Sequence, residues 1–181
     1  MVCYAFAQEH RESSEPASQI LMQLLTERLL LREANRADAN ELNAYQTDSR
    51  YLEHYATAPD AEEIVRLATA WAKELPRLNF QLIIETRESR DVIGCVGLRI
   101  DTAASTRAEV GIEIAPDYWR LGFASESLSC IEEFAISIGL TELIANTRQS
   151  NNRSRALLAS LGFSVDTFKG EDVILAKHLT E

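Results

Sequence analysis

The chain has 181 residues, of which 46% are hydrophobic and 25% are charged. This size and composition support one folded domain and exclude the disordered and fibrous classes. The formal net charge of -10 disfavours a nucleic-acid-binding protein, because neutralising phosphates requires clustered Lys and Arg.

Residues 1–25 include a polar, charged stretch around Pro16. We expect them to form an N-terminal arm or extension, with residues 26–181 as a single domain. The arm has no apolar segment typical of a signal peptide, and no apolar run approaches the roughly 20 residues of a transmembrane helix. The sequence therefore predicts a cytoplasmic protein that does not associate with membranes.

The first predicted elements are a strand and a helix. Residues 28–32 form a short apolar run, which predicts a strand. The polar residues 35–38 follow and predict the start of a helix, which would turn Leu42 and Tyr45 towards the core.

A second helix is predicted after Pro59, with Asp60 as its N-cap and Glu63 as the capping-box partner. Pro76 is expected to end this segment. Residues 80–85 and 92–100 are then predicted to be two strands joined by a polar turn, which favours a hairpin.

Residues 109–115 alternate apolar and non-apolar side chains, a two-residue period that predicts a strand with its carboxylates on one face. A helix is predicted from about Ala124, because apolar residues follow at helical spacing and Gly139 suits its C-terminal end. The short apolar run 143–145 predicts a further strand.

The remaining elements complete a mixed α/β pattern. Residues 151–161 are predicted to form a helix closed by Gly162. Residues 165–168 and 173–175 are predicted to form a final hairpin. The order of elements gives a mixed α/β (α+β) layer arrangement.

The segment between the strand 109–115 and the next helix has features of an anion site. A helix N-terminus presents free backbone N–H groups and the positive end of the helix dipole, which together suit a pyrophosphate. Gly122 allows a ligand to approach the backbone closely. A strand-turn-helix junction with a glycine also occurs where elements merely pack, so this segment alone does not decide between the two.

Four segments resemble one known family. The loop and helix start resemble the coenzyme A loop of the GCN5-related N-acetyltransferase (GNAT) superfamily, and closely resemble its RimJ/RimL-type subgroup of ribosomal-protein N-terminal acetyltransferases. The other three segments follow the family's order and are similar to its opening strand, its third strand and its Asn-x-x-Ser motif with a Leu-Gly-Phe helix ending. The four segments are residues 118–126, 26–32, 93–98 and 151–163.

The resemblance implies the GNAT fold: a central mixed, mostly antiparallel sheet of about six to seven strands, with helices on both faces and a V-shaped splay between strands four and five. It also implies acetyl-coenzyme A (acetyl-CoA) as co-substrate and no metal. The pantetheine would pair with residues 112–114, and Arg is well suited to the phosphates. The implied cofactor-binding residues are Ile112, Ile114, Trp119, Arg120, Leu121, Gly122, Phe123, Ala124, Ser125, Asn151 and Arg153.

The candidate catalytic residues are two carboxylates and one hydroxyl. An amine must lose its ammonium proton before it attacks, and either Glu109 or Glu113 could accept that proton. A salt bridge or a solvated strand face is the alternative role for each. Many members of the family protonate the leaving thiolate with a Tyr on the helix after the fifth strand, but this chain has none there. Ser154 is the nearest hydroxyl, and its alternative role is a helix cap.

The resemblance implies that Tyr51, His54 and Tyr55 contact the acceptor. The leading hypothesis is an N-acetyltransferase in which a primary amine attacks acetyl-CoA directly in a ternary complex. The acceptor would be an amine-bearing small molecule or a protein or peptide N-terminus, and the enzyme a monomer or homodimer. The alternative is a non-catalytic acyl-CoA-binding sensor or interaction module. A dinucleotide or P-loop protein is disfavoured, since neither glycine motif is present.

Overall fold

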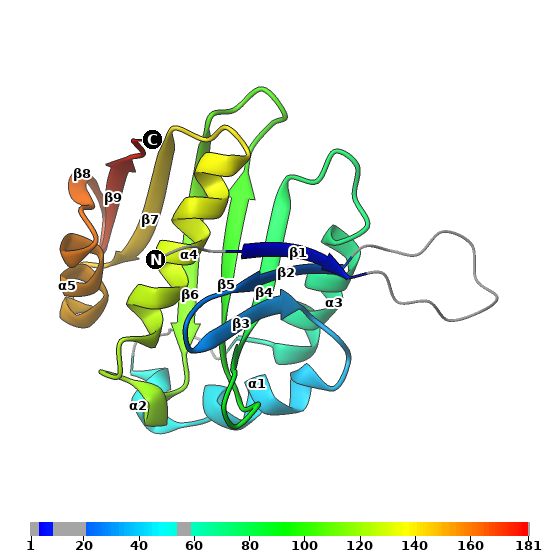
Figure 1. The fold of residues 1–181 in the computed structure, drawn as a ribbon. Coiled ribbons are helices and arrows are strands. Elements are labelled where there is room, and N and C mark those ends of the chain that lie inside the picture. The colour runs from blue at the N-terminus through cyan, green and yellow to red at the C-terminus, as the bar shows by residue number, and fades with distance from the viewer. Residues whose placement is uncertain (1–3, 9–20, 54–58, 181) are drawn as a thin grey trace.

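The computed structural model describes residues 4–8, 21–53 and 59–180. Within these residues all the strands form one sheet in the order β1-β2-β3-β4-β5-β6-β7-β9-β8 (Figure 1). Every neighbouring pair is antiparallel except β6 and β7, which are parallel. The strands are β1 (Tyr4–Gln8), β2 (Leu21–Leu25), β3 (Leu29–Glu33), β4 (Asn79–Thr86), β5 (Val92–Ile100), β6 (Arg107–Ile114), β7 (Glu142–Arg148), β8 (Ser164–Lys169) and β9 (Asp172–His178).

The sheet is mixed and mostly antiparallel, as predicted, but it has more strands than expected. The sequence predicted six to seven strands, whereas nine are present among the described residues. The two additional strands, β1 and β2, lie within residues 1–25 and pair with each other. β2 also pairs with β3, and Leu24 of β2 is buried in the core. The N-terminal extension therefore contributes an edge of the sheet.

Helices cover both faces of the sheet, which confirms that part of the fold prediction (Figure 1). α1 (Asp38–Gln46), α2 (Ser49–Leu52) and α3 (Ala61–Trp71) lie on one face. α4 (Phe123–Ser137) and α5 (Asn152–Ser160) lie on the other. The pattern did not predict α2, because a four-residue helix is too short to show periodicity.

The start of α3 follows the predicted capping only in part. The Asp60 carboxylate accepts a hydrogen bond of 3.1 Å from the backbone N–H of Glu63, so Asp60 is the N-cap. The Glu63 carboxylate binds the Arg66 guanidinium at 2.6 Å instead of returning to the cap. The capping box is therefore half formed, because an arginine one turn on competes for the carboxylate.

Two apolar clusters fix the helices to the sheet. Successive residues of a strand face opposite sides, so neighbouring positions of β4 serve different clusters. Leu82 and Ile84 pack with Leu128 and Ile131 of α4. Ile83, between them, belongs to the cluster on the α1–α3 face. Each fully buried Leu or Ile contributes about 1.5–3 kcal/mol through the hydrophobic effect.

The parallel pair β6 and β7 separates after three residues, as the V-shaped splay requires. Pairing runs from Arg107 opposite Glu142 to Glu109 opposite Ile144 and goes no further. β6 nevertheless stays paired with β5 up to Ile114, and β7 stays paired with β9 along its whole length. From Val110 onwards one edge of β6 therefore has no strand partner among the described residues, and the sheet opens at this point.

Candidate active site

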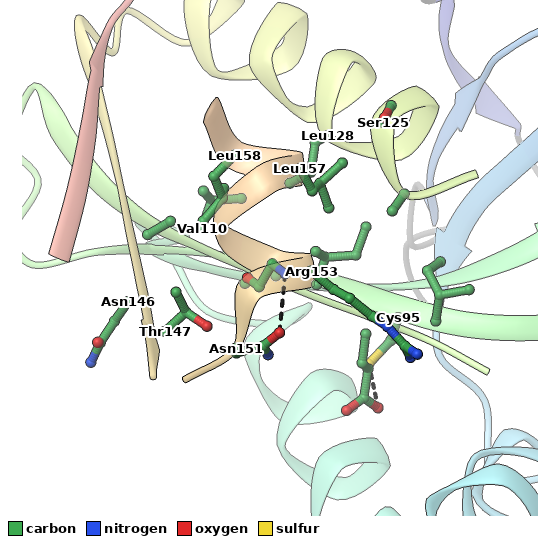
Figure 2. A pocket seen from close by; sticks show the side chains of 18 of the residues that line it. Cys95, Val110, Ser125, Leu128, Asn146, Thr147, Asn151, Arg153, Leu157 and Leu158 are labelled. Carbon is green, nitrogen blue, oxygen red and sulfur yellow. Dashed lines mark hydrogen bonds between the residues drawn. The ribbon is translucent and has the colours of Figure 1, made fainter. Parts of the chain in front are cut away.

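A cavity of about 1000 Å³ lies at this opening and reaches both faces of the sheet. Figure 2 shows apolar side chains of β6, α4 and α5 meeting around it, including Val110, Leu128 and Leu158. On the α1–α3 face the lining includes Tyr51 and Glu109. The splay thus connects two half-sites that the sheet would otherwise separate.

The N-terminus of α4 forms one end of this cavity. Gly122 is the N-cap with φ of +83°, and Arg120 is also left-handed with φ of +64°. No side chain in the described part of the chain caps the helix. Among the described residues, the backbone N–H groups of Phe123, Ala124 and Ser125 have no hydrogen-bond acceptor. Free amides at the positive end of a 15-residue helix make a site for an anion.

A buried carboxylate holds this loop against the first strand of the predicted domain. Glu126 is 5% exposed, and it accepts hydrogen bonds from the Arg28 backbone N–H at 2.9 Å, from Arg28 Nε at 2.7 Å and from the Thr26 hydroxyl. Arg28 also donates to the carbonyl of Leu121 at 2.9 Å. Burial raises the pKa of Glu126, but the hydrogen bonds from Thr26 and Arg28 outweigh it and the pKa is lowered.

Aromatic and cationic side chains flank the same loop. Trp119 Nε1 donates a hydrogen bond of 2.7 Å to the carbonyl of Ile114, the last residue of β6. The Arg153 guanidinium lies over the Trp119 ring, 4.7 Å from its centroid. Arg120 and Arg153 are both solvent-exposed and both line the cavity, so two cations lie close to the free amides.

Ser154 is not the N-cap of α5, which was the alternative role considered for it. The cap is Asn151, whose side chain accepts a hydrogen bond of 3.0 Å from the backbone N–H of Ser154 (Figure 2). Ser154 lies three residues further on and is therefore not the N-cap. Ser154 also lines the cavity. α5 contains no tyrosine.

The two candidate bases have different surroundings. Glu113 accepts hydrogen bonds from the Tyr45 hydroxyl at 2.7 Å, from Gln46 Nε2 at 2.8 Å, from Cys95 Sγ at 3.2 Å and from the Tyr51 hydroxyl. Burial raises the pKa of the Cys95 thiol, and the negative charge of Glu113 raises it further. Burial also raises the pKa of the Tyr45 hydroxyl, with additional contributions from Cys95 and Glu113. Both groups therefore remain protonated donors at neutral pH.

Glu109 is solvent-exposed and lines the cavity. Its carboxylate makes no hydrogen bond and no ion pair with any described residue. It lies opposite Arg99 in the β5/β6 ladder. Its carboxylate is thus the less constrained of the two.

Most of the predicted site residues converge on this cavity. Leu121 is the exception among the described ones: its side chain is exposed, and only its carbonyl takes part by binding Arg28. His54 and Tyr55 lie outside the described residues. The predicted residues that line the cavity are Tyr51, Glu109, Ile112, Glu113, Ile114, Trp119, Arg120, Gly122, Phe123, Ala124, Ser125, Asn151, Arg153 and Ser154.

Some contributors to the site were missed by sequence reasoning. Arg99 and Gln81 line the cavity on the α1–α3 face, and Gln46 binds Glu113 from α1. They lie in different strands and helices, so no local spacing links them. The only available signal was that Arg99 is a cation at the end of an apolar strand.

The residues present fit coenzyme A. A diphosphate requires several convergent N–H donors and cations, which the α4 N-terminus, Arg120 and Arg153 offer. A long pantetheine chain requires a channel with unpaired backbone along one side, which the free edge of β6 offers. Among the described residues no three His, Cys, Asp or Glu side chains form a group that could hold a metal ion.

Comparison with known proteins agrees with this geometry. The family model described as an acetyltransferase (GNAT) domain matches residues 28–164. The chain belongs to the GNAT acetyltransferase family. It is 33% identical over 146 residues to the uncharacterized N-acetyltransferase YoaA of Bacillus subtilis, covering 77% of this chain and 81% of that protein. The family and this N-acetyltransferase relative identify the protein as an acyltransferase.

Solved structures share the GNAT fold. A GNAT-family acetyltransferase from Bacillus anthracis superposes with a TM-score of 0.72 at 18% identity, covering 88% of this chain and all of that one. RimJ of Mycobacterium smegmatis, solved with CoA-disulfide, gives a TM-score of 0.68 at 19% identity and covers 83% and 81% of the two chains. GNAT enzymes take the acetyl group from acetyl-CoA. Among this chain's described residues, no helix has the length and apolar character to cross a membrane.

Proposed function

We propose that this GNAT protein is an N-acetyltransferase that moves an acetyl group from acetyl-CoA to a primary amine by direct attack in a ternary complex. The observation that carries the proposal is a continuous cavity that passes through the splay. It joins the free amides of the α4 N-terminus to the face that bears Glu109. A donor and an acceptor that bind from opposite faces could meet there without a covalent intermediate.

The donor would be held by residues of the loop, β6 and α5. When bound, it supplies an acetyl group activated as a thioester. The free amides of residues 123–125 would bind its diphosphate, and Arg120 and Arg153 would offset the phosphate charge. Ile112 and Ile114 would align the pantetheine along the free edge of β6. Asn151 would act indirectly by fixing the first turn of α5.

Glu109 is the proposed general base. A base needs an oxygen within reach of the ammonium proton, and the Glu109 carboxylate has no competing donor among the described residues. Glu113 already accepts from four donors, so its oxygens are occupied. An α-amino group with a pKa near 8 requires less help than a lysine near 10.4.

Ser154 is proposed to give a hydrogen bond to the departing sulfur. Ser154 lies in the first turn of α5 and lines the cavity. It is not needed as the helix cap, because Asn151 has that role. A serine hydroxyl is a weak acid, so its contribution would be hydrogen bonding and not full proton transfer. The absence of a tyrosine in α5 leaves this hydroxyl as the candidate.

We further propose that residues 26–181 form the acetyltransferase domain, with residues 1–25 as its extension, and that the protein acts in the cytoplasm as a monomer or homodimer. The acceptor would be a small amine or a protein or peptide N-terminus. The shared fold with RimJ of M. smegmatis supports placing the chain near the RimJ/RimL-type subgroup. Tyr51, whose hydroxyl binds Glu113, would form one wall of the acceptor pocket. Contact of His54 and Tyr55 with the acceptor stays a prediction.

The test is an acetyl-transfer assay against a panel of amines and N-terminal peptides. Two signals are measured: release of free thiol, and an increase of ~42 Da in the mass of the acceptor for each acetyl group transferred. Glu109→Gln is expected to lower kcat by about 10²–10⁴-fold while coenzyme A affinity is retained. Coenzyme A binding without thiol release for any amine would favour the alternative, a non-catalytic acyl-CoA sensor. Failure to bind coenzyme A would contradict both.

A further inference from the structure

The face of the β5/β6 ladder that points towards α1–α3 has a gap between two polar rungs. Residues directly opposite in an antiparallel pair share a face, and so do residues two apart. No register shift interrupts this part of the pair. The three successive rungs on this face are Cys95 with Glu113, Gly97 with Gly111, and Arg99 with Glu109.

The central rung leaves room for a ligand. Both of its residues are glycines, so the rung itself carries no side chain. Gln81 and Arg99 reach over Gly97, where a Cβ would lie 2.6 Å from Gln81 Oε1 and 2.7 Å from Arg99 Nη1, so the open space lies over Gly111. A Cβ at Gly111 would meet nothing within 4 Å, and both glycines line the cavity. The gap lies just where β6 loses its pairing with β7. An acceptor resting on it would therefore be next to the opening through which the donor side is reached.

Arg99 borders this gap as a cation held in place by uncharged partners. Its Nη1 donates to the carbonyls of Phe80 and Leu98, and its Nη2 donates to Gln81. The guanidinium lies 4.3 Å from the centroid of the Trp71 ring. Three of its five N–H groups are thus used. The Nε–H and one hydrogen on Nη2 have no acceptor among the described residues.

Other partly buried arginines are paired differently. Arg32 binds Asp38 and Glu85, and Arg77 binds Glu33, in each case a buried carboxylate. No carboxylate of a described residue lies within 4.0 Å of the Arg99 guanidinium. Burial lowers the pKa of Arg99, and attraction to Glu109 across the ladder offsets this cost only in part. An anionic ligand would supply further opposite charge. The arginine is fixed and partly desolvated, and its donors remain available.

We propose that Arg99 binds an anionic group carried by the acceptor, so that the substrate is a primary amine with a carboxylate or similar anion a few bonds away. This inference rests on the proposed acetyltransferase function and names its substrate class. Glu109 and Arg99 are opposite each other, with Cβ atoms expected about 4.5–5.5 Å apart. Glu109 would face the ammonium and Arg99 the carboxylate, which matches the charges of a free amino acid or of an acidic N-terminal residue.

The experiment compares acceptors that differ only in this anion. Acetyl transfer would be measured for each common α-amino acid against its amide, and for peptides beginning with Asp against peptides beginning with Asn. The wild-type enzyme is expected to prefer the anionic member of a pair by about 10–100-fold in kcat/KM. A preference for amino acids alone would identify a small-molecule acceptor, and a preference for Asp-peptides alone an acidic N-terminus.

Variants at Arg99 test whether this residue is responsible. Arg99→Gln should remove the preference for the anionic member of each pair, and Arg99→Lys should retain part of it. Equal use of both members by the wild-type enzyme would overturn the inference, as would equal loss on both substrates in Arg99→Gln. If Arg99→Gln does not fold, the wild-type comparison alone decides.

A binding measurement separates this inference from the proposed function. N-acetylated amino acids and their amides would be titrated into the coenzyme A-loaded protein by calorimetry. Tighter binding of the acids, lost in Arg99→Gln, supports the anion site even if no amine is acetylated, and in that case only the proposed catalysis fails. Turnover of neutral amines with no preference in either measurement leaves the catalysis standing and overturns the anion site.

Discussion

The indole Nε1 of Trp119 donates a hydrogen bond of 2.7 Å to the carbonyl oxygen of Ile114, and this bond ties the loop before α4 to the end of β6. The loop offers free amides, and the strand offers a free edge. The bond fixes the distance between them, so that one extended ligand can use both. Arg153, stacked on the same indole ring, adds a cation at this junction.

Trp119→Phe should therefore weaken coenzyme A binding. Phenylalanine keeps an aromatic face for Arg153 but cannot donate to Ile114. We expect Kd for coenzyme A to rise about 5–10-fold, which corresponds to about 1 kcal/mol for one hydrogen bond. The measurement is calorimetric titration of coenzyme A. Trp71→Phe, on the opposite face of the sheet, is the matched control and should change this Kd less than about twofold; an equal effect would contradict the prediction.

In Glu126→Gln, the free energy of unfolding should fall less steeply than in the wild type as the pH is lowered into the acidic range. The folded-state pKa of Glu126 is lowered from 4.5. The ionised carboxylate thus stabilises the fold above the unfolded-state pKa, and this contribution is lost as pH falls through the folded-state pKa. At pH 7 the variant should be less stable by about 1.5–3 kcal/mol, because hydrogen bonds to a charged group are lost.

The measurement is urea unfolding at a series of pH values from about 7 to 3. Below about pH 4.5 the free energies of unfolding of wild type and Glu126→Gln should converge. Glu88→Gln, in the exposed turn between β4 and β5, should follow the wild-type curve. A constant difference between wild type and Glu126→Gln across the whole range would show that the carboxylate's charge is not the cause.

Glu113→Gln should affect stability and Glu109→Gln should not. The amide offers a single acceptor oxygen to the four donors that now bind Glu113, and its own NH₂ group faces those donors. We expect a loss of about 1–3 kcal/mol in the free energy of unfolding at pH 7. Glu109→Gln should stay within about 0.5 kcal/mol of wild type. If Glu113→Gln abolished turnover at unchanged stability, Glu113 would be the base instead.

Two glycines of the same sheet should respond oppositely to alanine. At Gly111 a Cβ meets nothing within 4 Å, so Gly111→Ala should raise the free energy of unfolding by up to about 1 kcal/mol. The added methyl group would occupy the acceptor gap and lower kcat/KM for the amine, with coenzyme A affinity unchanged. At Gly94 a Cβ would lie 2.1 Å from the carbonyl oxygen of Glu113, so Gly94→Ala should separate β5 from β6 and destabilise the protein by about 3 kcal/mol or more.

These glycine results would be measured by urea unfolding together with steady-state kinetics in the amine. Unchanged kinetics for Gly111→Ala would place the acceptor elsewhere in the cavity. Stability equal to wild type for Gly94→Ala would mean that the backbone adjusts at this contact.

Local features of the chain were predictable because they depend on neighbouring residues. The alternation in residues 109–115 reports a strand directly, and Asp60 caps α3 through a bond to a residue three positions away. The resemblance of residues 118–126 to a coenzyme A loop similarly concerns one continuous segment. Both extra strands escaped prediction because the polar stretch around Pro16 indicated an arm, and the pairing of β2 with β3 leaves no local pattern in the sequence.

The sequence by itself determined β3 to β9, the longer helices and the glycine loop at the start of α4, since each follows from side-chain periodicity, capping or backbone freedom within a few residues. Only the tertiary structure decided which of the two carboxylates is held by hydrogen bonds. Glu113 is bound by Tyr45, 68 residues away, whereas Glu109 has no such partner among the described residues. The same holds for Arg99, whose position depends on Trp71 and Gln81. Contacts between distant segments form only when the chain folds, and no local pattern encodes them.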